Sequence, residues 1–272
     1  MKPFIIAEAG KNFIDHDWKK GAKTVPYYAE RAIALIKVAK QAGADAVKFQ
    51  THVFEDEQLM RSEKRYDWIK FNESITPFSF WKELRDCCDR IGIEFMTTPM
   101  SKMAAERMDT FVKRWKIGSG NVTDIELLKY VASTKKPVIL STGMSTQKQV
   151  EDAIDILKDS DLSLLYCKSI YPCPIMKVDF TKIKTMQDYF HFPVGFSDHT
   201  TLTYTSEIAI KYGATIIEKH FTMDKNAVGP DHRFSLSPDE LIYYVSLAKS
   251  YGDIIIPDLE ETAYWKDFRK VA

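Results

Sequence analysis

The strongest constraint on this chain is an eightfold alternation of short apolar runs with amphipathic helical segments. Each run is rich in Val, Ile, Phe and Thr, and has the length and composition of a strand that is buried on both faces. The runs cover residues 4–10, 45–50, 94–99, 114–120, 137–143, 162–169, 192–200 and 214–222. Eight strand–helix units in about 250 residues are typical of a closed parallel barrel. We therefore predict an α/β protein with a (β/α)8 (TIM) barrel fold as a single domain over residues 1–272.

The segments between the runs agree with this prediction. Helical periodicity occupies residues 27–44, 80–93, 101–114, 124–136, 146–159, 203–214 and 237–252. A doubly wound nucleotide-binding sheet is disfavoured, because the AEAGK sequence of the first unit is not the GxGxxG turn of that fold. Residues 16–28 and 52–80 are expected to form long loops on one rim of the barrel.

Composition excludes several classes of partner. Lys and Arg number 38 and Asp and Glu also 38, so the formal net charge is 38 − 38 = 0. A neutral chain has no global field that attracts nucleic acid or an anionic membrane. No apolar run approaches the roughly 20 residues of a membrane span. We predict a cytoplasmic protein whose partners are small molecules, with neither nucleic acid nor a membrane among them.

Polar side chains late in the strands are candidates for an active site, because such sites form at the C-terminal ends of barrel strands. Lysines occur near the ends of the second and fourth strands, at Lys48 and Lys116. Hydroxyls in equivalent positions are those of Thr98, Ser119, Ser141 and Ser197. Ammonium and hydroxyl donors together suit a small ligand with phosphate and carboxylate groups. Lys48 has two other possible roles, a structural ion pair or a Schiff base, and the latter implies aldolase chemistry.

Two histidines end the seventh and eighth strands. His199 follows Ser197, and His220 follows Glu218, at the spacing that keeps side chains on one face of a strand. If both face inward, their imidazoles meet at one rim of the barrel and can bind a divalent cation. The alternative is that each is a hydrogen-bonded core histidine, and the residues alone leave both readings open.

Nine ordered motifs give the chain a family resemblance. They are IAEAGKN, AGADAVKFQTH, TTPMS, KIGSG, PVILSTGM, SIYPCP, GFSDHT, EKHFTMD and GPDH, and they span residues 4 to about 240. The chain resembles the N-acetylneuraminate (sialic acid) synthase family, which includes legionaminate and pseudaminate synthases. The separation of His199 and His220, 220 − 199 = 21 residues, is similar to that of the paired metal histidines of the family.

The resemblance implies an enzyme that condenses phosphoenolpyruvate with the aldehyde of an N-acetylated hexosamine, N-acetylmannosamine or a modified relative. The products are a nine-carbon 2-keto acid and phosphate, and the cofactor is a divalent metal (Mn2+, Mg2+ or Co2+) that polarises the aldehyde. A homodimer is also implied. By resemblance, the metal ligands are His199 and His220, and the catalytic residues are Glu8, Lys48 and Asp231. The resemblance assigns phosphoenolpyruvate binding to Lys48, Thr98, Lys116, Ser119, Ser141 and Ser197. It assigns sugar binding to Gln50, Asn121, Tyr171 and Asp231.

The chain departs from the family pattern at several points. Asn121 stands after KIGSG where the family usually has Glu, and Phe13 follows Asn12 where the family usually has His. The chain is also expected to lack the C-terminal antifreeze-like domain of many members. Two other functions therefore stay open, a non-catalytic sugar- or phosphate-binding relative and a Schiff-base aldolase that uses Lys48.

Overall fold

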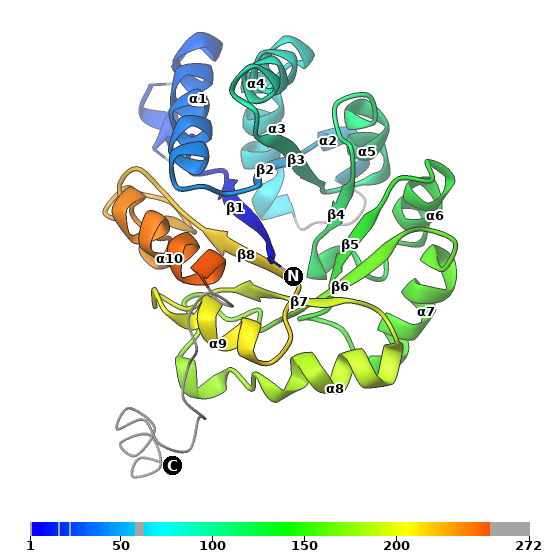
Figure 1. Cartoon of the computed structure of the whole chain (residues 1–272). Helices are drawn as coiled ribbons and strands as arrows, with labels where there is room; N and C mark the ends of the chain where they lie inside the picture. The colour runs from blue at the N-terminus through cyan, green and yellow to red at the C-terminus, as the bar shows by residue number, and fades with distance from the viewer. Residues whose placement is uncertain (1, 16, 22, 58–62, 251–272) are drawn as a thin grey trace.

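The computed structural model describes residues 2–15, 17–21, 23–57 and 63–250. Eight parallel strands follow the order β3-β2-β1-β8-β7-β6-β5-β4, and β3 lies beside β4, so the sheet curls into a nearly closed barrel (Figure 1). The predicted (β/α)8 barrel is confirmed. The strands are β1 (Phe4–Gly10), β2 (Ala46–Thr51), β3 (Glu94–Pro99), β4 (Trp115–Ile117), β5 (Val138–Ser141), β6 (Leu162–Cys167), β7 (Val194–Asp198) and β8 (Ile216–His220).

Helices surround the barrel, as Figure 1 shows. The α-helices are α1 (Val25–Gln41), α2 (Phe54–Glu57), α3 (Tyr66–Ile75), α4 (Phe78–Ile91), α5 (Lys102–Met108), α6 (Ile125–Ser133), α7 (Gln147–Leu157), α8 (Thr181–Phe190), α9 (Thr205–Lys211) and α10 (Pro238–Ser250). The short 3-10 helices are η1 (Trp18–Lys20), η2 (Glu63–Arg65), η3 (Ser119–Asn121), η4 (Ile175–Lys177) and η5 (His232–Phe234). None of the helices among the described residues is long and apolar enough to cross a membrane.

The structure differs from the prediction at three points. The segment 52–80, predicted as a long loop, folds largely into α2, η2 and α3, because Ile69, Phe71 and Ile75 of α3 are buried. Helix α8 was not among the predicted helices, and Ile183 is its only buried residue. The fourth strand is shorter than predicted and ends at Ile117, before the turn of η3.

The barrel interior consists of an apolar layer with a polar layer above it. The apolar layer contains Ile6, Ala46, Met96, Ile139, Leu165 and Ile216. Two residues further along the same strands stand Glu8, Lys48, Thr98, Ser141, Cys167 and Glu218, all of which are buried. Because successive side chains of a strand alternate between faces, residues two apart point the same way. The strands therefore carry their polar residues inward at their C-terminal ends, above an apolar floor.

Candidate active site

A cavity of about 400 Å3 lies above the apolar floor, at the C-terminal ends of the strands. Twelve of the thirteen residues predicted for the site line it. They are Glu8, Lys48, Gln50, Thr98, Lys116, Ser119, Asn121, Ser141, Tyr171, Ser197, His199 and His220. The thirteenth, Asp231, lines an adjoining pocket that shares Tyr171 with the cavity.

The ammonium of Lys48 is buried against a carboxylate and a hydroxyl. Its Nζ lies 2.7 Å from Oε2 of Glu8 and donates to Oγ1 of Thr98 at 2.9 Å. The amide of Gln50 donates to the other oxygen of Glu8 at 3.1 Å. Side chains from three neighbouring strands, β1, β2 and β3, thus hold the ammonium group of Lys48 in a fixed position.

A second buried lysine completes a four-charge cluster. Lys116 donates from Nζ to Oγ of Ser141 at 2.8 Å. Glu218 lies between the two lysines, with Oε2 3.6 Å from Nζ of Lys48 and Oε1 3.7 Å from Nζ of Lys116. Ser197 donates to Oε1 of Glu218 at 3.2 Å. Two ammonium and two carboxyl groups therefore lie close together in one buried cluster.

The protonation of this cluster follows from burial and charge. Burial raises the pKa of Glu8 to about 7, with Lys48 acting against this and Glu218 adding to it. Burial also acts to raise the pKa of Glu218, but the nearby lysines outweigh it and hold the pKa below its ordinary value. Burial lowers the pKa of Lys116. For Lys48 burial acts in the same direction, but Glu218 and Glu8 outweigh it and raise the pKa. At neutral pH, Glu8 is the group that readily exchanges a proton.

The two histidines face each other at the same rim. Their ring centroids lie 5.7 Å apart. Nδ1 of His199 donates a hydrogen bond to the carbonyl oxygen of Lys168 at 2.7 Å, which leaves Nε2 with a lone pair. Nδ1 of His220 is buried and has no hydrogen-bond partner in the described structure. Burial lowers the pKa of both rings, so both are neutral, as metal-ligating imidazoles are.

The remaining predicted residues lie on the side of the cavity next to the histidines. The ring of Tyr171 is 4.3 Å from that of His199, and burial raises the pKa of Tyr171 to about 12. Asn121 donates from its amide nitrogen to the carbonyl oxygen of Met100 at 3.2 Å. This bond fixes the amide, and its Oδ1 is buried without a partner in the described residues.

Asp231 approaches the cavity from the segment after β8. Its Oδ2 is 3.9 Å from Nδ1 of His220, and burial raises its pKa. Gly10 permits this approach, because a Cβ there would lie 3.3 Å from both Oδ2 of Asp231 and Oε1 of Glu8. Gly10 also has a φ of +52°, which few other residues adopt without strain.

Comparison with known proteins assigns the family. The NeuB family model matches residues 35–252. The chain belongs to the NeuB family. It is 38% identical to an N,N'-diacetyllegionaminic acid synthase of Legionella pneumophila over 262 residues, which cover 89% of this chain and 70% of the relative. It is 40% identical to an uncharacterized protein of Methanocaldococcus jannaschii over 241 residues, covering 87% of this chain and 67% of the relative.

Solved structures agree with the membership in the NeuB family. The crystal structure of an N-acetylneuraminic acid (sialic acid) synthetase from Leptospira borgpetersenii matches with a TM-score of 0.82 and 29% identity, covering 100% of this chain and 91% of that one. A spore coat polysaccharide biosynthesis protein of Bacillus subtilis matches with a TM-score of 0.80 and 30% identity, covering 98% and 77%. This NeuB-family chain is an enzyme of the sialic acid synthase type.

Several cavity residues of this NeuB-family protein were not predicted for the site. Glu218 was expected on the same strand face as His220 but was given no role in the site. Cys167 was missed, although both residues stand two positions beyond the apolar floor, where the period-two rule places them. Met100 and Met144 follow the ends of β3 and β5. Arg65 comes from the segment mistaken for a loop, and its sequence context gives no sign that it reaches the cavity.

Proposed function

We propose that this NeuB-family enzyme condenses phosphoenolpyruvate with the open-chain aldehyde of an N-acetylated hexosamine, N-acetylmannosamine or a modified relative. The products are a nine-carbon 2-keto sugar acid and phosphate. The observation that carries the proposal is the convergence of two buried lysines, a ring of hydroxyls and two neutral imidazoles on one cavity of about 400 Å3. Sites of this size typically enclose small ligands.

The lysine side of the cavity suits phosphoenolpyruvate. Its phosphate and carboxylate carry nearly three negative charges, and an otherwise neutral protein must supply the compensating charge locally. Lys48 and Lys116 offer that charge beside the hydroxyls of Thr98, Ser119, Ser141 and Ser197. Ser141 and Thr98 already accept hydrogen bonds from the two lysines, so the ammonium groups are oriented before the ligand arrives.

Glu8 is the proposed acid/base. A pKa of about 7 allows it to accept a proton from the attacking water or a hydroxyl and to return it at neutral pH. Gln50 and Lys48 hold both oxygens of the carboxyl group, so the proton is exchanged at a fixed position.

The residues of the histidine rim fit a divalent metal. No three His, Cys, Asp or Glu side chains of the described residues group closely enough to form a metal site on their own. His199 and His220 present two neutral imidazoles, and Nδ1 of His220 is buried without a hydrogen-bond partner among the described residues. A metal held by these two residues would polarise the sugar aldehyde, with its other coordination positions left to water or substrate oxygens.

The acceptor sugar then lies against Gln50, Asn121, Tyr171 and Asp231. The Oδ1 of Asn121 can accept a hydrogen bond from a hydroxyl or amide N–H of the sugar, but it cannot neutralise charge as the usual family Glu does. Lys48 is unsuited to a Schiff base, because its raised pKa keeps it protonated and a protonated amine is no nucleophile. The homodimer, the cytoplasmic location and the single-domain organisation stay predictions.

The decisive assay measures phosphate release from phosphoenolpyruvate with a panel of N-acetylated hexoses, after EDTA treatment and after addition of Mn2+, Mg2+ or Co2+. We expect release that depends on both a sugar and a metal.

Lys116→Met should weaken phosphoenolpyruvate binding by at least about tenfold, since a charge-assisted bond is lost. Lys113→Met, an exposed lysine before β4, is the control and should bind normally. Binding without phosphate release from any sugar would favour a non-catalytic relative.

A further inference from the structure

Asp231 reaches the candidate active site from a loop, whereas Glu8 belongs to a strand. The loop follows β8, and a parallel bridge between Phe221 and Leu236 closes its base. Asp231 lies between the two ends of that bridge. Groups carried by loops are positioned less precisely than groups carried by strands. Contacts beyond the bridge must therefore hold Asp231 in place.

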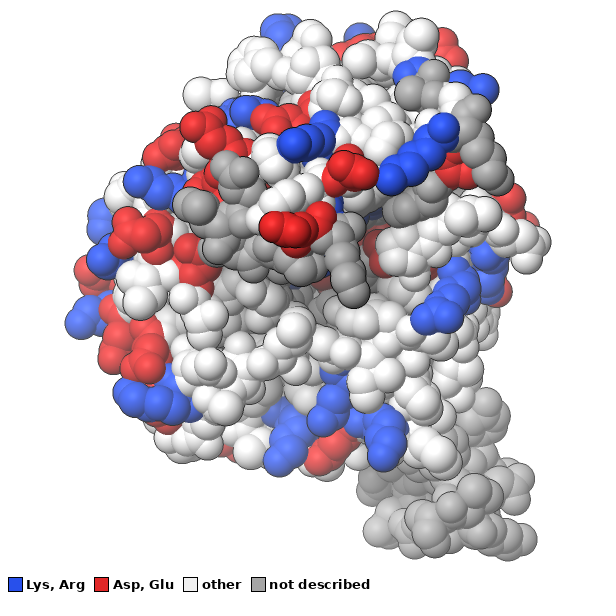
Figure 2. Space-filling view, turned by 180° about the vertical axis from the view of Figure 1, so that it is seen from behind, with Lys and Arg blue, Asp and Glu red and all other residues white. Residues whose placement is uncertain are grey.

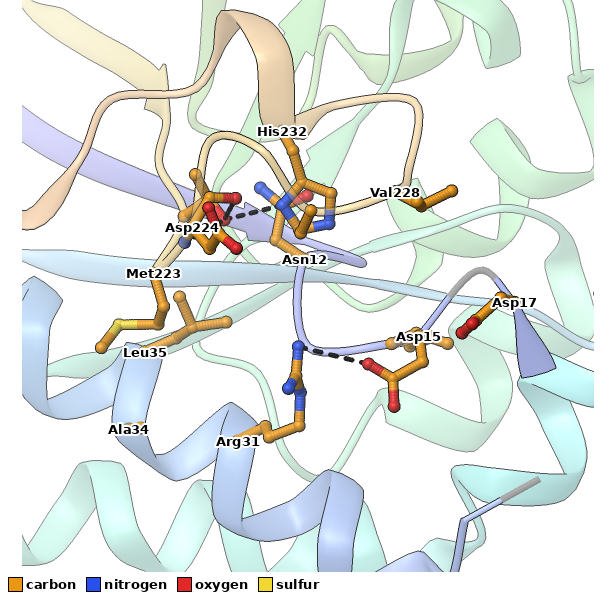
Figure 3. A pocket seen from close by; sticks show the side chains of 13 residues that line it. Asn12, Asp15, Asp17, Arg31, Ala34, Leu35, Met223, Asp224, Val228 and His232 are labelled. Carbon is orange, nitrogen blue, oxygen red and sulfur yellow. Dashed lines mark hydrogen bonds and ion pairs between the residues drawn. The ribbon is translucent and has the colours of Figure 1, made fainter. Parts of the chain in front are cut away.

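Asn12, two residues after β1, ties this loop to the barrel. Its amide nitrogen donates to the carbonyl oxygen of Phe221 at 2.7 Å and to Oγ of Ser235 at 3.1 Å. A carbonyl oxygen only accepts, so the NH2 group of the amide must face Phe221, and both of its protons are used. Asn12 is buried. Figure 3 shows it beside His232, where the segment after β1 meets the loop.

Ser235 continues this chain of hydrogen bonds to Asp231. Its Oγ accepts from Asn12 and donates its single proton to the carbonyl oxygen of Asp231 at 2.7 Å. The backbone N–H of Ser235 donates to the same oxygen at 3.2 Å. Ser235 is buried, so water does not compete for these bonds. The direction of the chain is fixed, from the amide of Asn12 through the hydroxyl of Ser235 to Asp231.

The two ends of Asp231 are held differently. Its carbonyl oxygen accepts from Ser235, and its carboxylate faces Gly10, where a Cβ would lie 3.3 Å from Oδ2. Gly10 and Asn12 belong to the same strand end. One short segment thus leaves room for the carboxylate and also holds the loop that carries it. Neither Asn12 nor Ser235 lines the cavity or the adjoining pocket, so both act through Asp231.

We propose that Asn12 and Ser235 are positioning residues that hold the carboxylate of Asp231 toward the acceptor sugar. The inference rests on the proposed condensation, in which Asp231 contacts that sugar. Basic and acidic side chains are interspersed over the face shown in Figure 2, so surface charge gives a ligand little direction and the cavity groups must orient it. A shift of about 1 Å in such a group costs about 100-fold in rate.

Ser235→Ala tests the middle of the chain, because it removes the hydroxyl and leaves the backbone N–H on the carbonyl oxygen of Asp231. We expect kcat/KM for the sugar to fall about tenfold, while the Kd of phosphoenolpyruvate in calorimetry changes by less than about twofold. Thr76→Val is the matched control, since the buried hydroxyl of Thr76 also donates to a carbonyl oxygen, that of Asn72 at 2.8 Å, at the end of α3. It should keep both constants. Equal weakening of sugar turnover and phosphoenolpyruvate binding in Ser235→Ala would overturn the proposal.

A double-mutant cycle separates positioning from a purely structural role. If Ser235 acts through the carboxylate of Asp231, the effect of Ser235→Ala on kcat/KM should shrink to less than about twofold in the Asp231→Asn background. An undiminished effect in that background would contradict the proposal. Asn12→Ala should follow the same pattern. Its circular dichroism spectrum serves as the folding control, because the variant leaves the carbonyl oxygen of Phe221 without its donor.

Hydrogen exchange tests the same contacts without turnover. A parent chain that releases no phosphate with any sugar would refute the proposed function and leave this measurement intact. Amide exchange over residues 231–236, followed by mass spectrometry, should be at least about fivefold faster in Ser235→Ala than in the parent and unchanged in Thr76→Val. Unchanged exchange in Ser235→Ala would show that the hydroxyl does not hold Asp231, whether or not the parent is active.

Discussion

Replacing Glu218 with Gln should destabilise the free enzyme and strengthen its binding of phosphoenolpyruvate. The carboxylate lies 3.6 Å from Nζ of Lys48 and 3.7 Å from Nζ of Lys116. At an effective dielectric constant of about 20, each attraction is about 5 kcal/mol before desolvation is subtracted. Removing one partner of a buried ion pair costs about 3–5 kcal/mol, because the other charge is left uncompensated.

The structure favours the lower end of that range. Lys48 keeps Glu8 at 2.7 Å after the substitution, whereas Lys116 keeps only Ser141 and the carbonyl oxygen of Ile117. A loss of about 3 kcal/mol corresponds to a fall in Tm of roughly 6–12 °C for a protein of this size. Phosphoenolpyruvate then supplies the missing negative charge without competition from the carboxylate, so its Kd should tighten by about tenfold.

Thermal unfolding with and without phosphoenolpyruvate measures both effects. We expect a lower Tm for Glu218→Gln alone and a larger ligand-induced rise in Tm than in the parent. Glu94→Gln is the control, since Glu94 pairs with Nε of Arg114 at 2.7 Å at the start of β3, away from the cavity. That variant should lose stability without any change in the ligand-induced rise. A Tm of Glu218→Gln within about 2 °C of the parent would refute the reasoning.

Three further substitutions test the proposed roles. Glu8→Gln should lower kcat by at least about 100-fold and abolish a pH dependence of kcat/KM centred near pH 7. The pKa of Glu8 in the folded protein, about 7, exceeds its ordinary value of 4.5, so its protonation stabilises the fold below pH 4.5 and that stability is lost as the pH rises through 7. Urea unfolding of the parent, but not of Glu8→Gln, should show this loss. His220→Ala should abolish Mn2+ binding in equilibrium dialysis and leave the circular dichroism spectrum unchanged, and retained binding would contradict the ligand assignment. Asn121→Glu should tighten Mn2+ binding by about tenfold in calorimetry, whereas an unchanged affinity would show that this position lies outside the metal environment.

The barrel was predictable from the sequence because its strands are buried on both faces and leave continuous apolar runs. The same rule placed most of the cavity, since polar residues such as Lys48 and Ser141 interrupt those runs at the strand ends. Glu218 was harder to assign, because its importance comes from two lysines on strands far away in the sequence. The segment 52–80 was misjudged, since the burial of Ile69 and Phe71 is created by tertiary packing rather than by a long apolar period. Arg65 was missed for the same reason.

The pairing register of β7 and β8 fixes two sets of side chains at once, an ion pair outside the barrel and the two histidines of the proposed metal rim inside it. Asp198 and Lys219 are register partners on the outer face, where their side chains form a buried ion pair of 2.8 Å against α9 and α10. Tyr244 of α10 donates to the same carboxylate at 3.0 Å. A slip of β8 by one residue would turn Lys219 into the barrel and leave Asp198 without this partner, so this register is strongly favoured. The same register sets Ser197 opposite Glu218 and places His199 and His220 at one height on neighbouring strands. The spacing of the two imidazoles therefore depends on Asp198, Lys219 and Tyr244, which lie on the outer side of the sheet and do not line the cavity.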